Sequence, residues 1–357
     1  VLNRFCSDIL PKIHHHIRRL DLESSTMERI LSTTNYPNLH QLGLFNLHAK
    51  TAASLSLFTS QSPLNHIDTN QIDLLIIDIK QYGDMCERSD INLLIFIHIL
   101  TIFCNLKYFS FDTSQQLSFG NSPPNIFSST LVELHVSLND LTDCLYLLDG
   151  RFSQLHTLRV YTVREKSTHV IIDNKDNLSN LKHFSLDHRF YTDLYDNLII
   201  PLLQRMINLE ELGLYLKISR KQTVVDGADL KKNILNHMSG LKKFSFSIRS
   251  NIHLNNGNNE QPQKKNHQDS SITRYFHLTK LHLLEVHDDY IEEFLSDSKT
   301  CLPNTIDLTI EYEAMQRVTE NCSKLICLNL YVLDDEHDVN LDDIKHYFPR
   351  AKIFAKS

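Results

Sequence analysis

Hydrophobic residues recur along the chain with the spacing L-x-x-L-x-L, in which Ile, Val, Phe or Cys can replace Leu. The last two positions of each triplet are two residues apart, so they share one face of a short strand, and the residues between them point to the other face. Twelve triplets occur, and their first residues run from 17 to 325, so eleven intervals average 28 residues. The triplets are Ile17-Leu20-Leu22, Leu39-Leu42-Leu44, Ile72-Leu75-Ile77, Leu106-Phe109-Phe111, Leu131-Leu134-Val136, Leu155-Leu158-Val160, Leu181-Phe184-Leu186, Leu209-Leu212-Leu214, Leu241-Phe244-Phe246, Leu281-Leu284-Val286, Thr305-Leu308-Ile310 and Leu325-Leu328-Leu330, of which only Thr305 departs from the apolar pattern.

Helical patterns follow several of these strands. Their apolar residues recur at intervals of three and four, as on one face of a helix. The run from Ile91 to Cys104 is the most apolar, but it is shorter than a membrane-spanning helix requires, so we expect a core helix there. The other expected helices lie within residues 143–148, 197–206, 228–235 and 290–295.

A strand and a helix that alternate at this period predict an α/β leucine-rich-repeat solenoid, because such repeats are about 20–29 residues long. We expect a horseshoe of about twelve irregular repeats, with parallel strands on the concave face and helices on the convex face. An asparagine directly precedes the first triplet residue in several repeats, as in Asn38-Leu39, Asn105-Leu106 and Asn208-Leu209. The repeat domain is expected to span residues 17–357. Residues 1–16 are expected to lead in from a module that this chain does not include.

Residues 251–273 form the longest polar interruption of the pattern. They are rich in Asn, Gln and Lys, as in Asn255 to Lys265, and cannot bury a core. We expect a disordered loop, and not a domain boundary, because the repeats resume after it with the same spacing.

Composition and charge limit the possible partners. The chain has 36 Lys and Arg against 43 Asp and Glu, a net charge of −7. This balance disfavours binding to nucleic acid or to anionic membranes. The 7 cysteines are odd in number, widely spaced and without a C-x-x-C pair. They predict neither a zinc site nor a disulfide framework, and they favour a reducing compartment, the cytoplasm or the nucleus.

No motif for catalysis, cofactor binding or metal binding stands out. The chain has no G-x-S-x-G, G-x-G-x-x-G, H-E-x-x-H or phosphate-loop sequence. His14-His15-His16 is interpreted as a solvated strand lead-in, on which adjacent rings point to alternate faces and cannot converge on one metal ion. We therefore expect no enzyme activity, no cofactor and no metal.

Two groups of charged residues receive the same interpretation. Carboxylates that cluster before or within helices are expected to be solvated and to favour the helix dipole. The main basic cluster is interpreted as a solvated turn, too small to bind nucleic acid. The residues are Asp288, Asp289, Glu292, Glu293, Asp334, Asp335, Glu336 and Asp338 for the acids, and Lys217, Arg220 and Lys221 for the bases.

The strand residues that point away from the core are the best candidates for function. They line the concave face of the predicted solenoid, and aromatic residues and arginine among them are typical of protein interfaces. We expect this face to hold a protein partner. The residues are Phe45, Tyr108, Glu133, His135, Arg159, Tyr161, His183, Glu211, Tyr215, Glu285, His287, Glu311 and Tyr331.

Several segments resemble the repeat region of F-box proteins with leucine-rich repeats, and more closely a divergent, expanded family of invertebrate F-box-domain proteins. These segments are Ile9–His15, Met27–Leu31, Tyr36–Leu39, Asp143–Gly150 and Asn197–Leu212. The resemblance implies the substrate receptor of a cullin-type ubiquitin ligase: an F-box precedes the repeats and binds the ligase adaptor, and the repeats hold the protein substrate.

The chain departs from that family at the F-box. Leu10-Pro11 is similar to the L-P-x-E opening of an F-box, but Lys12-Ile13 follows, and the first repeat begins near Ile17. We therefore expect the F-box to be missing from this chain, so that adaptor binding would need it upstream. Two alternatives remain open: a stand-alone leucine-rich-repeat scaffold or inhibitor without a link to ubiquitin, and an enzyme with an unrecognised site.

Overall fold

The chain forms two units, Val1–Thr168 and His169–Ser357, and each contains a series of parallel β-strands. The structure is a computed structural model. It describes residues 1–48, 63–80, 89–120, 124–163, 177–220, 225–252, 273–275, 277–284, 286–296, 299–303, 306–311, 327–331 and 352–356. The expected loop lies largely outside these residues: β9 (Lys243–Ile252) ends just before it, and β10 (Thr273–Arg274) begins at its last residue.

In the first unit the strands follow one another in sequence order across the sheet, β1-β2-β3-β4-β5-β6, and all described pairs are parallel. The elements are α1 (Leu2–Arg4), η1 (Phe5–Ile9), α2 (Leu10–Ile13), η2 (His14–His16), β1 (Arg19–Glu23), α3 (Ser24–Leu31), β2 (Gln41–Leu47), η3 (Pro63–His66), η4 (Thr69–Gln71), β3 (Leu74–Ile79), α5 (Ser89–Ile102), β4 (Tyr108–Thr113), β5 (Glu133–Leu138), α6 (Leu141–Leu147) and β6 (Thr157–Thr162).

The second unit repeats this arrangement with the order β7-β8-β9-β11-β13-β14-β15, and β10 pairs separately with β12. Its elements are β7 (His183–Thr192), η5 (Tyr195–Ile199), α7 (Ile200–Gln204), β8 (Glu211–Arg220), α8 (Gly227–Asn233), η6 (Leu235–His237), β9, β10, β11 (Lys280–Leu283), α9 (Asp288–Leu295), β12 (Thr300–Cys301), β13 (Asp307–Glu311), β14 (Cys327–Tyr331) and β15 (Lys352–Lys356).

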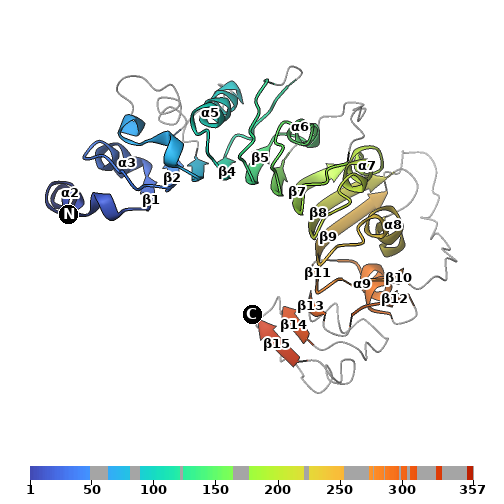
Figure 1. Ribbon diagram of the computed structural model, residues 1–357. Helices are drawn as coiled ribbons and strands as arrows, with labels where there is room; N and C mark the ends of the chain where they lie inside the picture. Colours follow the sequence, from blue (N-terminus) through green and yellow to red (C-terminus); the bar gives the residue numbers. More distant parts are fainter. Residues whose placement is uncertain are drawn as a thin grey trace. The chain divides into compact units, whose positions relative to one another are not determined.

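In each unit, helices cover one face of the parallel strands. In Figure 1, α3, α5 and α6 lie along one side of strands β1–β6, and α7, α8 and α9 lie along one side of strands β7–β13. Each expected helix overlaps a helix of the structure, with ends that differ by a few residues. Residues 91–104 overlap α5, 143–148 overlap α6, 197–206 overlap η5 and α7, 228–235 overlap α8, and 290–295 overlap α9. The prediction of an α/β fold with parallel strands and separate helices is confirmed.

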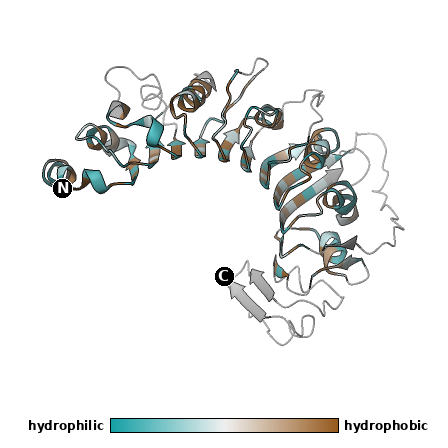
Figure 2. Ribbon diagram, in the orientation of Figure 1, coloured by the Kyte–Doolittle hydropathy of each residue, from teal (hydrophilic) through white to brown (hydrophobic). Residues whose placement is uncertain are grey.

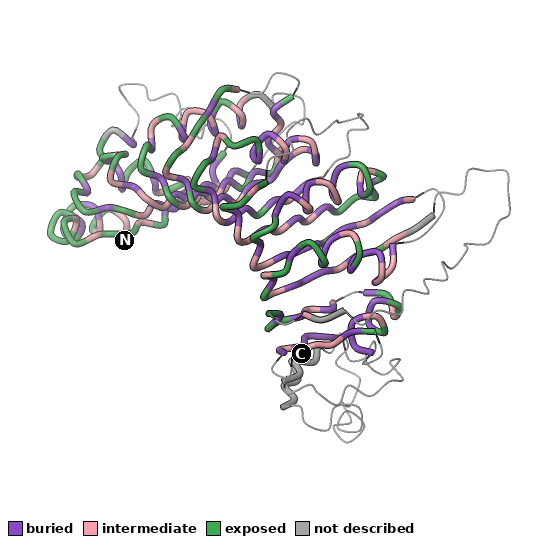
Figure 3. The backbone as a smooth tube through the Cα atoms, turned by 45° about the vertical axis from the view of Figure 1, so that its right-hand side comes forward, coloured by how far each residue is buried: buried purple, intermediate pink, exposed green. Residues whose placement is uncertain are grey.

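The predicted triplets set the register between strands. In the first unit Leu42, Leu75, Phe109, Leu134 and Leu158 are successive register partners, and each is at most 1% exposed. Along β3, β4 and β11, buried residues alternate with more exposed ones. Figures 2 and 3 show hydrophobic and buried positions among hydrophilic and more exposed ones on the coloured strands. We call the helix-covered face the anchor face and the opposite face the open face.

The second unit has the same rows of anchors. Phe184, Leu212, Phe244, Leu281 and Leu308 are register partners across β7, β8, β9, β11 and β13, and each is at most 2% exposed. The row continues in the backbone register through β14 and β15. Neighbouring partners are between 20 residues apart, as from Asp307 to Cys327, and 37 apart, as from Lys243 to Lys280.

One triplet was placed wrongly. The anchors of β11 are Leu281 and Leu283, with Leu278 buried ahead of them, and not Leu281-Leu284-Val286. Leu278-Leu281-Leu283 has the same spacing as the expected triplet, so the periodicity alone allowed both placements. Pairing with Phe244 and Leu308 on the two neighbouring strands selects the earlier one.

The asparagines that precede the anchors link successive repeats. The Asn38 side-chain amide donates to the His15 carbonyl at 2.6 Å, Asn105 donates to Asn70 at 2.8 Å, and Asn208 donates to Ser179 at 3.1 Å. In the repeat that follows the one of Asn105, the Thr130 hydroxyl takes this role and donates to the Cys104 carbonyl at 2.9 Å. Each bond joins a turn to a backbone carbonyl of the preceding repeat.

The N-terminal residues are helical and not a strand lead-in. Residues 2–16 form the run α1, η1, α2 and η2, and His14–His16 is a 3-10 turn. The prediction that adjacent His rings point to alternate faces of a strand is therefore wrong, because the ring centroids of His15 and His16 lie only 3.9 Å apart. His14 is instead tied to the Asn35 carbonyl at 2.7 Å from Nδ1.

Candidate functional site

The open face of β4, β5 and β6 carries a cluster of four residues, Tyr108, Glu133, His135 and Arg159, which we call the first-unit cluster; the first three are joined by hydrogen bonds. Tyr108 is the register partner of Glu133, and His135 is the partner of Arg159. The Tyr108 hydroxyl lies 3.2 Å from His135 Nδ1, and His135 Nε2 lies 2.7 Å from Glu133 Oε1. The structure thus brings four of the predicted residues together on one face. Glu133 and His135 share this face because they are two residues apart on β5, whereas Tyr108 and Arg159 come from the neighbouring strands.

The bonds of this cluster fix the His135 tautomer. An ionised Glu133 can only accept, so Nε2 carries the proton and Nδ1 accepts from the Tyr108 hydroxyl. Burial lowers the pKa of His135, and the nearby Arg159 lowers it further, against the opposing effect of Glu133. Burial raises the pKa of Tyr108, and Glu133 adds to that rise. Both shifts favour the uncharged form of the side chain.

The open face of β7, β8 and β9 carries a second group, Tyr191, Tyr215, Lys217 and Arg249, which we call the second-unit patch. Lys217 pairs in register with both Tyr191 and Arg249, so the three form one row across the sheet. Tyr215, two residues before Lys217, is 40% exposed, and Tyr191 is 46% exposed. The interpretation of Lys217 as part of a solvated turn is therefore wrong, because Lys217 lies within β8.

A β-bulge in β7 creates this row. His188 pairs with Leu216 and Tyr191 with Lys217, so Arg189 and Phe190 have no register partner in β8. Phe190 is 57% exposed. Bulges re-aim side chains and are common next to functional sites. Phe190 and Tyr191 were not predicted, because they do not alternate with the anchor residues of a triplet. The two adjacent aromatic residues after Leu186 are the sequence feature that indicates them.

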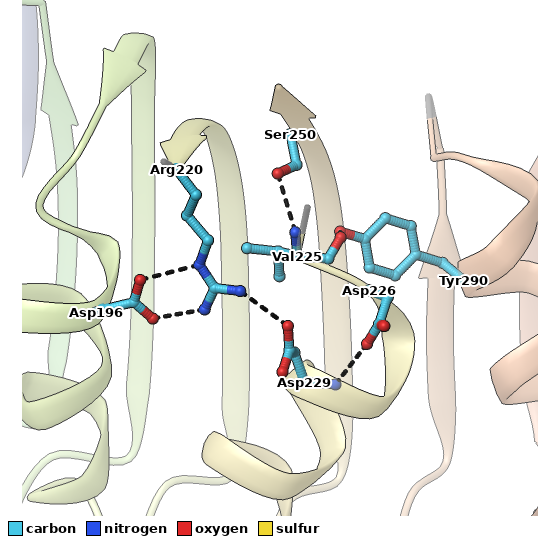
Figure 4. Close-up of polar contacts among 7 residues, drawn as sticks. All are labelled: Asp196, Arg220, Val225, Asp226, Asp229, Ser250 and Tyr290. Carbon is cyan, nitrogen blue, oxygen red and sulfur yellow. Dashed lines mark hydrogen bonds and ion pairs between the residues drawn. The ribbon is translucent and has the colours of Figure 1, made fainter. Parts of the chain in front are cut away.

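A buried ion network holds the end of β8 from the anchor face (Figure 4). Arg220 Nε lies 2.9 Å from Asp196 Oδ2 in η5, and its Nη1 lies 2.8 Å from Asp229 Oδ2 in α8. The Arg220 side chain is only 11% exposed, so the solvated-turn interpretation is wrong here also. Burial alone would lower the pKa of Arg220, but the two carboxylates outweigh it and raise it.

The end of β9 is held by hydrogen bonds to Val225, the residue that precedes Asp226 and α8. The Val225 amide donates to Ser250 Oγ at 3.0 Å, and the Tyr290 hydroxyl donates to the Val225 carbonyl at 2.6 Å (Figure 4). Asp226 caps α8 by accepting from the Asp229 amide at 2.8 Å. Because Ser250 adjoins Arg249 and Arg220 follows Lys217 by three residues, these contacts hold the backbone of the second-unit patch in place.

A buried lysine joins the next two helices of the second unit. Lys231 of α8 is 4% exposed, and its Nζ lies 2.8 Å from both Glu293 Oε1 and the Glu293 carbonyl in α9. Burial lowers the pKa of Lys231, against the effect of Glu293. Its contacts lie within the helix layer, so its role is to join helices.

The remaining predicted residues are distributed along the open faces. Phe45 lies in a bulge of β2 beside Asn46, whose φ of 53° is one that asparagine tolerates. His183 pairs in register with Glu211, and Glu211 lies 3.7 Å from Lys243. Tyr161 lies in β6, and Glu311 of β13 pairs in backbone register with Tyr331 of β14.

One predicted residue does not join the open face, and another lies outside the part of the chain that the structure describes. His287 is the N-cap of α9, where its Nδ1 accepts from the Asp289 amide at 3.3 Å, so its placement on a strand is wrong. The cause is the misplaced triplet at β11, whose open-face residues are Lys280 and His282. Glu285 lies outside the described residues. Asp288 and Asp289 occupy the first turn of α9, as expected for acids that favour the helix dipole.

The described residues include no group of three or more His, Cys, Asp or Glu side chains placed to hold a metal ion. Within the same residues, no helix has both the length and the apolar character that crossing a membrane requires. No protein-family model and no curated protein matches the chain.

Proposed function

We propose that the chain is a protein-recognition module, and specifically the substrate-binding arm of an F-box-type ubiquitin-ligase receptor of the cytoplasm or nucleus. In this proposal the strands of both units belong to one leucine-rich-repeat solenoid of about twelve irregular repeats, and the open face is its concave surface. An F-box upstream would bind the ligase adaptor. The repeats themselves would perform no chemistry.

One observation carries the proposal: the anchor rows run in register across successive parallel strands, while the open face keeps tyrosine, histidine and arginine side chains. Tyr108, His135 and Arg159 lie on three neighbouring strands, and Tyr191 and Tyr215 lie on two others. Tyrosine and arginine are enriched at protein interfaces, since they combine apolar area with hydrogen-bonding groups. Stacked repeats with exposed strand faces are a common platform for such binding.

The ligase part of the proposal is tested by adaptor binding. We expect the protein expressed from its complete gene to copurify with the cullin-ligase adaptor, and residues 1–357 alone to fail to do so. As a matched control, Tyr215→Asp in the complete protein should leave adaptor binding unchanged, because Tyr215 belongs to the open face. If the complete protein does not bind the adaptor, the ligase role is wrong, and the stand-alone scaffold becomes the better explanation.

A further inference from the structure

A row of mostly small polar residues crosses the open face of the second unit, and we call it the floor row. Its members occupy one register position on five neighbouring strands, each between two buried anchors. They are Ser185 of β7, Gly213 of β8, Ser245 of β9, His282 of β11 and Thr309 of β13. Ser245 and Thr309 are only 6% and 5% exposed, although the helices lie on the opposite face (Figure 1). Short side chains between rows of longer ones lie lowest, so this row is the floor of the open face.

Gly213 keeps the middle of the floor row free of a side chain. A Cβ atom at Gly213 would lie 2.8 Å from Ser185 Oγ, so only a hydroxyl occupies the space beside this glycine. The first unit differs at the equivalent position, Gly43, where the Phe45 ring and the Asp21 carboxylate fill that space. A glycine inside a strand often marks a place where a ligand or another backbone approaches closely.

Three adjacent side chains of the floor row are unused within the chain. Among the residues that the structure describes, the hydroxyls of Ser245 and Thr309 and the ring of His282 make no hydrogen bond. Burial lowers the pKa of His282, and Lys243 lowers it further against the opposing effect of Asp307, so the neutral imidazole is favoured. A hydroxyl and a neutral imidazole can each donate and accept. Folding therefore leaves donors and acceptors here for an external polar group.

The charges beside the floor row are of mixed sign. On one side Glu211, Lys243, Lys280 and Asp307 are successive register partners, two acids and two bases. On the other side lie Asp187, whose Oδ1 is 3.8 Å from Arg189 Nε, and Glu311 at the end of β13. Neither sign prevails along the row. It therefore suits a neutral polar ligand better than a nucleic acid, which needs many phosphate contacts.

We propose that the floor row binds the main chain of an extended segment of a protein partner, with peptide N–H and C=O groups on Ser245, His282 and Thr309. This inference rests on the proposed function and names the form of the substrate. A peptide backbone repeats neutral donors and acceptors at every residue, and small floor residues let it approach. Five strands spaced at about 4.8 Å span about 19 Å, the length of about six extended residues.

The test offers the immobilised full chain a library of capped, neutral peptides of eight residues and identifies the retained peptides by mass spectrometry. The same library is offered to Ser245→Phe, in which a ring fills the space above the floor row. We expect the unaltered chain to retain a set of peptides, and Ser245→Phe to retain about a tenth of them or less. No retention by the unaltered chain, or equal retention by both, would overturn the proposal.

A matched control is Ser110→Phe in the first unit. Ser110 alternates with buried phenylalanines on the open face of β4, as Ser245 does on β9. The control should change retention about twofold or less, because the added ring lies in the other unit. Far-ultraviolet circular dichroism checks that both variants fold. Equal losses in the two variants would mean that added bulk acts without regard to place, and the floor row would be wrong.

A second variant removes the hydroxyls and little volume. Ser245→Ala with Thr309→Val should weaken binding of the best retained peptide about fivefold or more, because two hydrogen bonds to it are lost. Its Tm should be unchanged or higher, because the hydroxyls make no hydrogen bond among the described residues. Unchanged affinity, or a lower Tm, would show that the hydroxyls do not serve the ligand.

The main chain is tested by N-methylation of the central amides of the same peptide, which removes N–H donors and keeps every side chain. We expect binding about tenfold weaker or less. Equal binding would mean that side chains are read, and would overturn the proposal. Self-association lost in Ser245→Phe, with no peptide retained, would assign the row to a second copy of the chain. None of these measurements uses the ligase adaptor, so a failure here and a failure of adaptor binding are distinguishable.

Discussion

At the scale of single residues, alternation along each strand separates two roles. Leu212 is 1% exposed on the anchor face, and its neighbour Glu211 is half-exposed on the open face. Adjacent strand residues point to opposite faces, so their contributions to stability should differ strongly although they are one peptide bond apart.

Leu212→Ala should lower the free energy of unfolding by about 2–5 kcal/mol, because it leaves a cavity in a well-packed anchor row. Glu211→Ala should change it by about 0.5 kcal/mol or less, because the contact of Glu211 with Lys243 is a surface ion pair. Urea unfolding followed by circular dichroism measures both. Similar losses for the two variants would contradict the assignment of the two faces.

His188 occupies an anchor position, as the register partner of Leu216, and is 1% exposed. Burial lowers its pKa from 6.5 to about 4. Above pH 6.5 the imidazole is neutral in both the folded and unfolded states. Between pH 6.5 and 4 only the unfolded chain takes up the proton, so His188 lowers the stability as the pH falls.

We expect this loss to reach roughly 3 kcal/mol near pH 4, at 1.36 kcal/mol per pKa unit. His188→Gln keeps a neutral polar side chain and should remove that part of the pH dependence. The measurement compares the free energies of unfolding of the two proteins at pH 7 and pH 4.5. If the difference between them is the same at both values, His188 is not held neutral by burial.

At the scale of elements, ion pairs in the helix layer of the second unit join successive repeats. Arg220 connects β8 with η5 and α8, and Lys231 connects α8 with α9. Removing one member of a buried pair is costly because the other charge stays in a low-dielectric environment. The two carboxylates of Arg220 differ here, since the side chain of Asp229 is 7% exposed and that of Asp196 is 49% exposed.

Arg220→Met should therefore destabilise the protein by about 3–5 kcal/mol, because buried Asp229 loses this cation. Asp196→Asn should cost about 1 kcal/mol or less, because its side chain is solvated. Adding Asp229→Asn to Arg220→Met should recover part of the loss. Thermal unfolding of the three variants decides: no recovery in the double variant would mean that Arg220 acts through packing instead of charge.

At the scale of the whole molecule, each unit has its own anchor rows and its own helix layer. In stacked repeats each element contacts mainly its neighbours, so stability is close to a sum of local terms. Phe109 in the first unit and Phe244 in the second unit are equivalent anchors, exposed by 0% and 1%. They provide a matched pair of probes.

Phe109→Ala should speed hydrogen exchange of backbone amides in β3–β5 and leave β8 and β9 protected. Phe244→Ala should do the reverse, because each substitution removes packing from one unit. Mass spectrometry of exchanged peptides reads both units in one experiment. If either substitution speeds exchange equally in both units, the chain unfolds as a single cooperative body.

The sequence by itself determined the parallel α/β architecture. An apolar period of two followed by one of three to four, repeated about every 28 residues, leaves few other ways to bury Leu42, Leu134 and Leu212. It also placed Tyr108, His135 and Arg159 on the open face, because they alternate with those anchors. The presence of asparagine before the anchors was visible too, but not its bond to the preceding repeat.

Only the tertiary structure decided the register at β11 and the bulge in β7. Both depend on hydrogen bonds between strands that are about 30 residues apart, which local periodicity does not specify. The register moved His287 from a strand to a helix cap, and the bulge aligned Tyr191 with Lys217. Contacts across repeats likewise turned Arg220 from an expected surface cation into the centre of a buried network, because its partners come from two other elements.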